Sequence, residues 1–241
     1  MLNKMRIAKY ISNSGFCSRR EAEKLIEKKI VKINNILCDH PSNTVNENDK
    51  ITIGKQTIKL NNTIRLWKLY KPIKYICSTK DEQNRKKIFD LIPKTFPRMI
   101  SIGRLDFMSE GLLLFTNNGN FANHCMHPSN TIDREYLVRA RGDFSIEKKN
   151  KMLDGIIIDG QKHQFTDVVE GEKVGSNQWF SVCLVSGKNR EVRKIFQSLD
   201  LEVSRLKRTR FGPIFLPSTL KKGKTIELTE KEISELKNYG K

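Results

Sequence analysis

The sequence predicts an α+β protein in two parts: a small N-terminal unit of two helices and short strands, followed by a larger domain of mixed helices and strands. Three observations support this prediction. The first sixty residues of the 241-residue chain carry their own helix and hairpin signals. A polar stretch at residues 60–63 then has the character of a linker. Beyond it, strand patterns and a few helices follow one another without the regular alternation of a βαβ fold.

Two helices are expected at the start of the chain. One apolar helical face runs from Met5 to Ser12, and Gly15 is expected to end this helix because glycine accepts a left-handed backbone. The second helix begins at Ser18, since its hydroxyl and the carboxylate of Glu21 have the spacing of a capping box. Four apolar residues share one face of this helix: Ala22, Leu25, Ile26 and Ile30. Four cations fall largely elsewhere and stay free for solvent or phosphate: Arg19, Arg20, Lys24 and Lys28.

A β-hairpin is expected after the second helix. Val31 and Ile33 alternate with polar residues, as in a half-buried strand. Asn34 and Asn35 can adopt the positive φ of a tight turn, after which Ile36 resumes the strand. Two further short strands are expected at residues 50–53 and 57–60.

The larger domain opens with a strand pattern over residues 65–70, which Pro72 ends because proline has no amide proton for a sheet. Three more strands are expected at residues 112–116, 135–139 and 179–185. A helix is expected near residues 190–199.

The composition favours a polyanionic partner. The chain has 45 Lys and Arg against 27 Asp and Glu, a formal net charge of +18, so nucleic acid is the leading partner class and an anionic membrane surface is second. A hydrophobic content of 37% with 12 Phe argues against a disordered chain. No run of 18 apolar residues and no apolar signal core occur, so we expect a cytoplasmic protein.

Metal and disulfide frameworks lack support in the sequence. The five cysteines lie at least 21 residues apart and form no paired motif: Cys17, Cys38, Cys77, Cys125 and Cys183. His124 and His127 stand three apart, which is half of a metal site, but no third ligand cluster follows. Surface or loop histidines are the better interpretation, and no metal is expected.

Asp106 is the first candidate for chemistry. It lies in a glycine-bounded loop directly before a strand that should be buried, where an unpaired charge is costly. Taken alone, capping of a turn by its side-chain oxygen is the commoner role, ahead of catalysis. Arg104, two residues away, is either its ion-pair partner or a contact to phosphate.

A second candidate segment, residues 186–196, is a glycine turn that enters a cation-rich helix. From Ser186 to Arg210 there are eight basic and three acidic residues, a net charge of 8 − 3 = +5. Free amides and side-chain cations converge at such a helix N-terminus, which suits phosphate. A solvated basic face explains most of these residues singly, but the segment as a whole favours RNA contact.

Tyr136 is a third candidate, on a strand with charged neighbours. One interpretation is a ring packed in the core with its hydroxyl near an edge. The other is a ring that stacks on an unpaired base.

Taken together, these segments resemble the bacterial RsuA/RluB family of ribosomal RNA pseudouridine synthases, which carry an N-terminal S4-type RNA-binding domain. The helix pair and hairpin of residues 6–35 look like the S4 domain. Residues 103–106 with 109–116, 134–136 and 187–193 match the family's three motifs in order. Within the family, residues 122–129, 177–180 and 203–212 look most like the RluB branch, and the RsuA branch is the closest rival.

The resemblance implies an S4-type domain at residues 3–62 and a synthase domain at 63–241 built on a largely antiparallel sheet. It makes Asp106 the catalytic aspartate, Tyr136 the ring against the target base, and Arg193 the basic partner of the aspartate. The implied reaction isomerises a flipped uridine to pseudouridine and needs no cofactor. Residues expected to bind RNA are Arg104, Arg6, Lys9, Arg19, Arg20, Lys24, Lys188 and Arg190.

The RluB branch acts on a uridine of large-subunit ribosomal RNA near the peptidyl-transferase centre, and the RsuA branch on small-subunit ribosomal RNA. The resemblance therefore implies ribosomal RNA as the partner, and a monomer with no membrane association. Because S4 units also occur in proteins that only bind RNA, a non-catalytic ribosome-assembly factor is the alternative from another class. A basic peripheral membrane protein is weaker, since the basic helices lack large apolar faces.

Overall fold

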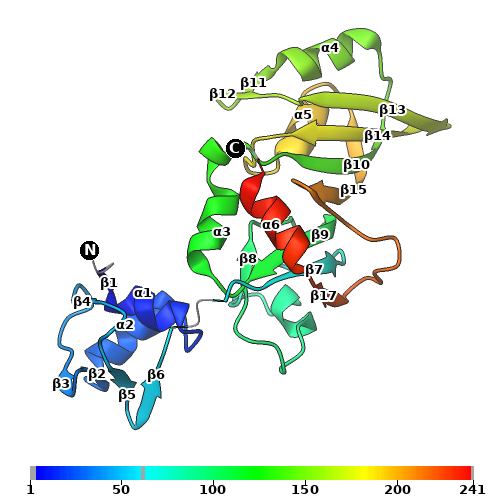
Figure 1. Cartoon of the computed structure of the whole chain (residues 1–241). Helices are drawn as coiled ribbons and strands as arrows, with labels where there is room; N and C mark the ends of the chain where they lie inside the picture. The colour runs from blue at the N-terminus through cyan, green and yellow to red at the C-terminus, as the bar shows by residue number, and fades with distance from the viewer. Residues whose placement is uncertain (1–3, 61–62, 240–241) are drawn as a thin grey trace. The chain divides into compact units, whose positions relative to one another are not determined.

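The computed structural model describes residues 4–60 and 63–239 (Figure 1). The chain divides into two compact units. One comprises Met1–Arg65 with Lys94–Ile100 and Thr116–Phe121; the other comprises Leu66–Pro93, Ser101–Phe115 and Ala122–Lys241. Two residues of the predicted linker, Asn61 and Asn62, lie outside the described residues.

The first unit packs two helices beside short antiparallel strands. Its elements are β1 (Met5–Arg6), α1 (Ile7–Asn13), α2 (Arg19–Glu27), β2 (Val31–Ile33), β3 (Ile36–Leu37), β4 (Thr44–Val45), β5 (Ile51–Ile53) and β6 (Gln56–Ile58). The four-stranded sheet has the order β3-β2-β5-β6, and β1 pairs with β4. Ile7, Ile11, Ala22 and Ile26 are completely buried or nearly so and join the helices to the sheet in one core.

Local signals predicted this unit well, with two errors. The capping box of Ser18 and Glu21 is confirmed, and Asn34 and Asn35 have φ values of 51° and 68° at the hairpin turn. Met5 was expected in the first helix, but it pairs with Val45 in a strand, a contact between distant segments. Ile30 was expected on the helical face and is 40% exposed, because α2 ends before it.

The second unit is built on a large mixed sheet. Its strands are β7 (Leu66–Lys71), β8 (Ile100–Ile102), β9 (Glu110–Thr116), β10 (Arg134–Arg141), β13 (Asp167–Val174), β14 (Asn177–Leu184), β15 (Glu202–Phe211), β16 (Ile214–Phe215) and β17 (Thr225–Glu227). The main order is β13-β14-β10-β15-β9-β7-β17. The pairs β13–β14, β14–β10, β10–β15 and β7–β17 are antiparallel, whereas β15 and β9 run parallel. The predicted α+β class and largely antiparallel sheet are confirmed.

Helices and a small hairpin accompany this sheet. They are η1 (Ile88–Leu91), α3 (Gly119–Met126), η2 (Pro128–Asn130), α4 (Ile146–Asp154), β11 (Ile156–Ile158), β12 (Gln161–His163), α5 (Glu191–Gln197) and α6 (Glu230–Asn238). Phe196 of α5 packs against Phe180 and Phe165, with ring centroids 5.4 and 6.0 Å apart. Residues of β7 and β9 are buried on both sides, whereas β10 and β14 alternate between buried and partly exposed side chains. One face of β10 and β14 is therefore open.

The parallel contact between β9 and β15 depends on a glycine. Gly111 lies opposite Arg208 and has a φ of +111°. A Cβ at this position would lie 2.2 Å from the carbonyl oxygen of Arg208. No side chain fits between the two backbones, and Gly111 follows directly on the loop that carries Asp106.

We therefore expect Gly111→Ala to lower the free energy of unfolding by about 3 kcal/mol or more, because backbone strain and a steric clash add. Urea unfolding measures the change. Gly175→Ala is the matched control: its φ is +58° and nothing lies within 4 Å of the added Cβ. The control should lower the free energy of unfolding by only about 1 kcal/mol. Equal losses in the two variants would show that the close approach is not the cause.

Candidate active-site cleft

A cleft of about 1350 Å³ opens in the second unit. Its walls include the loop before β9, parts of β10 and β15, and the loop that enters α5. Figure 1 labels these three strands, which belong to the large sheet, and α5. Five of the predicted site residues line it: Asp106, Tyr136, Arg104, Lys188 and Arg190. The fold therefore brings segments from three separate sequence motifs to one place.

The wall of the cleft is cationic. Eight lysine or arginine side chains line it, against three carboxylates, which favours a polyanionic ligand. The carboxylates belong to Asp81, Asp106 and Glu191. Asp81 is paired with Arg85 at 2.6 Å.

Glu191 binds the main chain of the loop that carries Lys188 and Arg190. Its side chain is 3% exposed, and its Oε1 accepts a hydrogen bond from the Ser186 hydroxyl at 2.7 Å and lies 3.1 Å from Nδ1 of His163. Its Oε2 accepts from the main-chain amide of Lys188 at 3.0 Å. From the other side, Arg134 donates to the carbonyl oxygens of residues 132, 185 and 186. The loop that carries Lys188 and Arg190 is thus fixed at both flanks.

Asp106 differs from the other two carboxylates. It is half-buried in the loop between β8 and β9. Its main-chain oxygen accepts from the Ser109 amide at 3.0 Å and from Nζ of Lys71 at 3.0 Å. Within the described residues, no hydrogen bond or ion pair is formed by its side-chain oxygens. The turn is capped by the backbone of Asp106, so the carboxylate stays available to a ligand.

Lys71, which the sequence did not single out, holds this loop in place. Its side chain is completely buried on β7, and Nζ donates to the carbonyl oxygens of Pro72, Asp106 and Ser109 at 3.1, 3.0 and 2.7 Å. Burial lowers the pKa of Lys71 to about 8, and nearby negative groups, Asp106 among them, oppose that shift. The amine is therefore mainly protonated at neutral pH. Lys68 stands on the same strand, so the sequence carries no signal that singles out Lys71.

Arg193, the predicted basic partner of Asp106, is bound to main-chain oxygens. Its guanidinium donates to the carbonyl oxygens of Val203 and Met108 at 3.0 and 3.1 Å. Within the described residues no ion pair joins it to Asp106, and it is not part of the cleft wall. Burial lowers the pKa of Arg193, Arg190 lowers it further, and the charge of Asp106 raises it. Arg193 thus feels the aspartate electrostatically and fixes the same loop through Met108.

Tyr136 is mostly packed, and it also borders the cleft. It lies on β10, opposite Val182 of β14 and Arg208 of β15, and is only 9% exposed. It also lines the cleft. Most of the ring is therefore packed, with an accessible edge on the cleft side.

Arg208 is a second cation that the sequence did not identify. It is 2% exposed, lines the cleft, and donates from Nε to the carbonyl oxygen of Leu112 at 2.7 Å. In the part of the chain that the structure describes, its buried Nη2 has no hydrogen-bond partner. Arg208 therefore presents an unsatisfied donor close to the strand that follows Asp106.

Three of the cations that line the cleft differ in exposure and in hydrogen bonding. Arg104 and Arg190 are exposed, and Arg190 has a left-handed backbone with a φ of 52°. Lys188 is half-buried and donates from Nζ to the carbonyl oxygen of Lys162. Arg104 and Arg190 are therefore the better placed to contact phosphate.

In the first unit, the predicted RNA-binding cations lie on the outside. Lys9 is half-buried. The other four are exposed: Arg6, Arg19, Arg20 and Lys24. The buried face of α2 consists of Ala22 and Ile26, so these cations take no part in the core.

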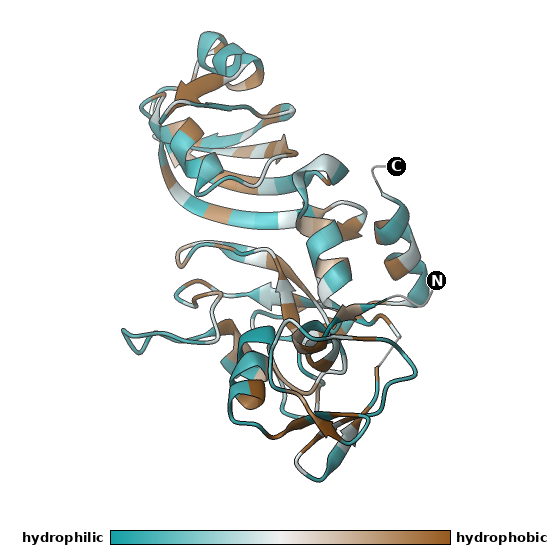
Figure 2. Ribbon diagram, turned by 90° about the vertical axis from the view of Figure 1, so that its left-hand side faces the viewer, coloured by the Kyte–Doolittle hydropathy of each residue, from teal (hydrophilic) through white to brown (hydrophobic). Residues whose placement is uncertain are grey.

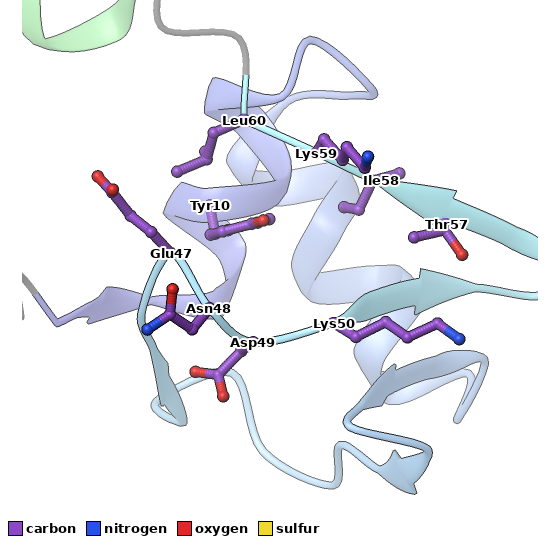
Figure 3. A pocket seen from close by; sticks show the side chains of 9 residues that line it. All are labelled: Tyr10, Glu47, Asn48, Asp49, Lys50, Thr57, Ile58, Lys59 and Leu60. Carbon is purple, nitrogen blue, oxygen red and sulfur yellow. The ribbon is translucent and has the colours of Figure 1, made fainter.

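A pocket of about 380 Å³ in the first unit is a poor phosphate site (Figure 3). Glu47 and Asp49 line it together with Tyr10. Burial raises the pKa of Tyr10, and the two carboxylates raise it further. Asp49 is moreover occupied, because it accepts from Asn34 and the amide of Asn46.

Metal-binding clusters and membrane-spanning helices are both absent from the described residues. No group of three or more His, Cys, Asp or Glu side chains among residues 4–60 and 63–239 is arranged to hold a metal ion. His127 lies 2.7 Å from the Ser129 hydroxyl, and His124 lies 3.0 Å from the side-chain amide of Asn130. Over the same residues, no helix has the length and apolarity needed to cross a bilayer.

Comparison with known proteins identifies related chains. Residues 65–198 match the family model of RNA pseudouridylate synthase, and residues 5–51 match that of the S4 domain. Ribosomal large subunit pseudouridine synthase B of Vibrio vulnificus is 37% identical over 237 residues, which cover 96% of this chain and 74% of the relative. The protein of the same name from Buchnera aphidicola is 38% identical over 240 residues, covering 97% and 96%. An uncharacterized RNA pseudouridine synthase of Rickettsia felis is 41% identical over 230 residues, covering 94% and 97%.

Solved structures share the fold. A crystal structure of a pseudouridylate synthase matches with a TM-score of 0.67 at 24% identity, covering 96% of this chain and 99% of that chain. An H/ACA ribonucleoprotein bound to a substrate RNA containing 2′-deoxyuridine matches with a TM-score of 0.50 at 20% identity, covering 66% and 50%.

The Lys71 contacts lead to a prediction. Lys71→Met keeps a long side chain but removes the buried ammonium that donates to three carbonyl oxygens, so we expect the free energy of unfolding to fall by about 3 kcal/mol. Urea unfolding measures the loss, and Lys151→Met, an exposed lysine on α4, is the control. If both variants unfold at the wild-type urea concentration, the buried ammonium does not stabilise the loop.

Proposed function

The chain belongs to the RNA pseudouridylate synthase family, and from this premise we propose that it converts a uridine of ribosomal RNA to pseudouridine with Asp106 as the nucleophile. The observation that carries the proposal is the state of the three cleft carboxylates. Asp81 is paired with Arg85, and Glu191 is buried in a hydrogen-bond network. Among the described residues of the cleft wall, Asp106 alone has a carboxylate with no protein partner.

The reaction balances without a further reactant. The N1–C1′ bond of the uridine breaks, the uracil turns, and a C5–C1′ bond forms. The proton that C5 loses is matched by one that N1 gains. A carboxylate can form and release the covalent adduct that such an exchange requires. Attack on the base, attack on the sugar and proton removal toward a glycal all use the same carboxylate.

The cleft supports entry of a flipped nucleotide. Its volume of about 1350 Å³ exceeds that of an ordinary small-molecule pocket. Leaving the stack costs the target base a few kcal/mol, and the accessible edge of Tyr136 offers it a replacement contact. Arg104 and Arg190 are positioned to hold the flanking phosphates, and Lys188 supports the same loop.

We assign Arg193 a different role from that of a direct ion-pair partner. It positions the loop through the carbonyl oxygen of Met108, as Lys71 does through those of Asp106 and Ser109. The charge of Asp106 acts on both cations: it raises the pKa of Lys71 and that of Arg193, against the lowering that burial causes.

We assign a different function to each of the two parts of the chain. We propose that residues 3–62 form an S4-type domain that recruits RNA and that residues 63–241 carry the catalysis. We also propose that the chain acts as a monomer. Action on ribosomal RNA of a bacterium implies a cytoplasmic enzyme.

Large-subunit ribosomal RNA, near the peptidyl-transferase centre, is the proposed target. The support is the name of the relatives from Vibrio and Buchnera, which match almost the whole of this chain. A purely RNA-binding assembly factor has no need of an unpaired carboxylate in a cationic cleft. Mapping of pseudouridines in both ribosomal RNAs of a deletion strain separates the large-subunit target from a small-subunit one.

We expect Asp106→Asn to abolish pseudouridine formation, with a loss of at least about 10³-fold, because the amide is not a nucleophile. The measurement is carbodiimide-adduct primer extension on ribosomal RNA from a deletion strain complemented with the variant. RNA affinity should survive, since Asp106 carries no phosphate contact. Asp154→Asn, an exposed residue at the end of α4, is the control. Full modification by the Asp106 variant would remove this carboxylate from the mechanism.

The S4-type domain is tested by neutralising its exposed helix cations. The triple change R19Q/R20Q/K24Q leaves the buried face of α2 and its capping box intact. We expect KM to rise and the salt dependence of binding to weaken by a slope of about 2, with kcat unchanged. The control K50Q/K55Q/K59Q removes the same charge from exposed lysines near β5 and β6. Equal effects of both triples would mean that net charge, and not the α2 surface, recruits the RNA.

A further inference from the structure

The open face of the large sheet carries an aromatic ring that two arginines approach. Arg139 of β10 lies opposite Trp179 of β14 on one side and Arg205 of β15 on the other. Both guanidinium groups approach the indole ring, at 5.9 and 5.8 Å from its centroid. Stacking on an aromatic ring holds a guanidinium in a fixed plane while its edge stays available.

These three residues point away from the proposed active site. Side chains alternate along a strand, so Arg139, three positions from Tyr136, lies on the opposite face of β10. Tyr136, Leu206 and Arg208 line the cleft. Trp179, Arg139 and Arg205 do not contribute to its wall.

The guanidinium groups keep donors for a ligand. Arg139 donates from Nε to the Ser204 hydroxyl at 3.0 Å, and Arg205 donates from Nε to Glu110 at 2.6 Å. In the part of the chain that the structure describes, neither arginine uses its Nη nitrogens in a hydrogen bond. Two forked donors therefore face solvent, and such forks match the geometry of phosphate oxygens.

Further cations extend this surface, which we call the outer basic face. It comprises Arg139, Arg141, Arg205, Lys207 and Lys222, with Trp179 and Tyr70. Arg141 is exposed, and Lys207 and Lys222 lie 5.3 and 5.8 Å from the Tyr70 ring centroid.

The carboxylates around this face do not cancel its charge. Glu110 is 2% exposed and bound by Arg205 and Lys222, each at 2.6 Å. Glu202 lies opposite Arg141, and Glu135, at the other end of β10, is bonded to Arg210 and Thr209. Five cations thus stand against Glu110 and Glu202, which leaves a net positive surface.

We propose that the outer basic face is a second RNA-binding surface, which holds the phosphate backbone of a ribosomal RNA segment that flanks the modified uridine. The charge and the forked donors fit a phosphate backbone, and the aromatic rings serve to orient the cations. The inference rests on the proposed function for the identity of the RNA. Ribosomal RNA is much larger than the cleft, so a substrate that fills the cleft still has segments to reach another face.

The test compares two RNAs that carry the same uridine: a short stem-loop that fills the cleft, and a transcript of several hundred nucleotides. R139Q/R141Q neutralises two cations of the outer basic face and leaves Arg205, which holds Glu110, unchanged. For the long transcript we expect about a tenfold loss of affinity and a decrease of about 1.5 in the salt-dependence slope. Affinity for the stem-loop and kcat on it should equal those of the wild type.

The control K151Q/K237Q removes two exposed charges from α4 and α6 and should change neither affinity. Filter binding gives the affinities without turnover, so a wild type that forms no pseudouridine would overturn the proposed function and leave this test intact. Unfolding in urea checks the double variant; if it is unstable, R141Q alone serves, since Arg141 is exposed. Equal loss for both RNAs, or no loss for the long one, would overturn the second surface.

Discussion

The loop that carries Asp106, with the start of β9, depends on cations that bind the backbone rather than the carboxylate. Nζ of Lys71 holds the carbonyl oxygens of Asp106 and Ser109, Arg193 holds that of Met108, and Arg208 holds that of Leu112. These cations come from β7, α5 and β15, so three elements distant in sequence fix seven residues of chain. Burying a cation is costly, and each hydrogen bond to a backbone carbonyl oxygen offsets part of that cost without neutralising a carboxylate.

This arrangement explains how a carboxylate remains unpaired in a cationic cleft. A direct salt bridge would consume the lone pairs that an attacking oxygen needs, whereas a cation that is bound to the backbone still contributes its field. The second carboxylate of the basic loop, Glu191, shows the contrast: three donors occupy it and it shapes the main chain of Lys188. The same chemical group thus serves structure at one position and is left free for reaction at the other.

Local signals account for what the sequence predicted. The capping box at Ser18 and the paired asparagines at Asn34 depend on residues within three positions, so they can be identified without the fold. Met5 was placed wrongly, and the backbone contact of Arg193 was not predicted, for a common reason: strand pairing with Val45 and the carbonyl oxygen of Met108 are partners that only the tertiary structure supplies. The sequence did not identify Lys71, because its acceptors are main-chain atoms, which leave no pattern in a sequence.

The same limit applies to charge. Net charge counts Lys71, Arg208 and Arg205 equally, although the first two are buried and committed to carbonyl oxygens, and the third is shared with Glu110. A formal charge of +18 therefore does not show how many cations RNA can contact. The cations left for phosphate are those with free donors, and they occur on both sides of one sheet. Because strand alternation sends Tyr136 and Arg139 to opposite faces, a single strand can serve the cleft and the outer basic face at once.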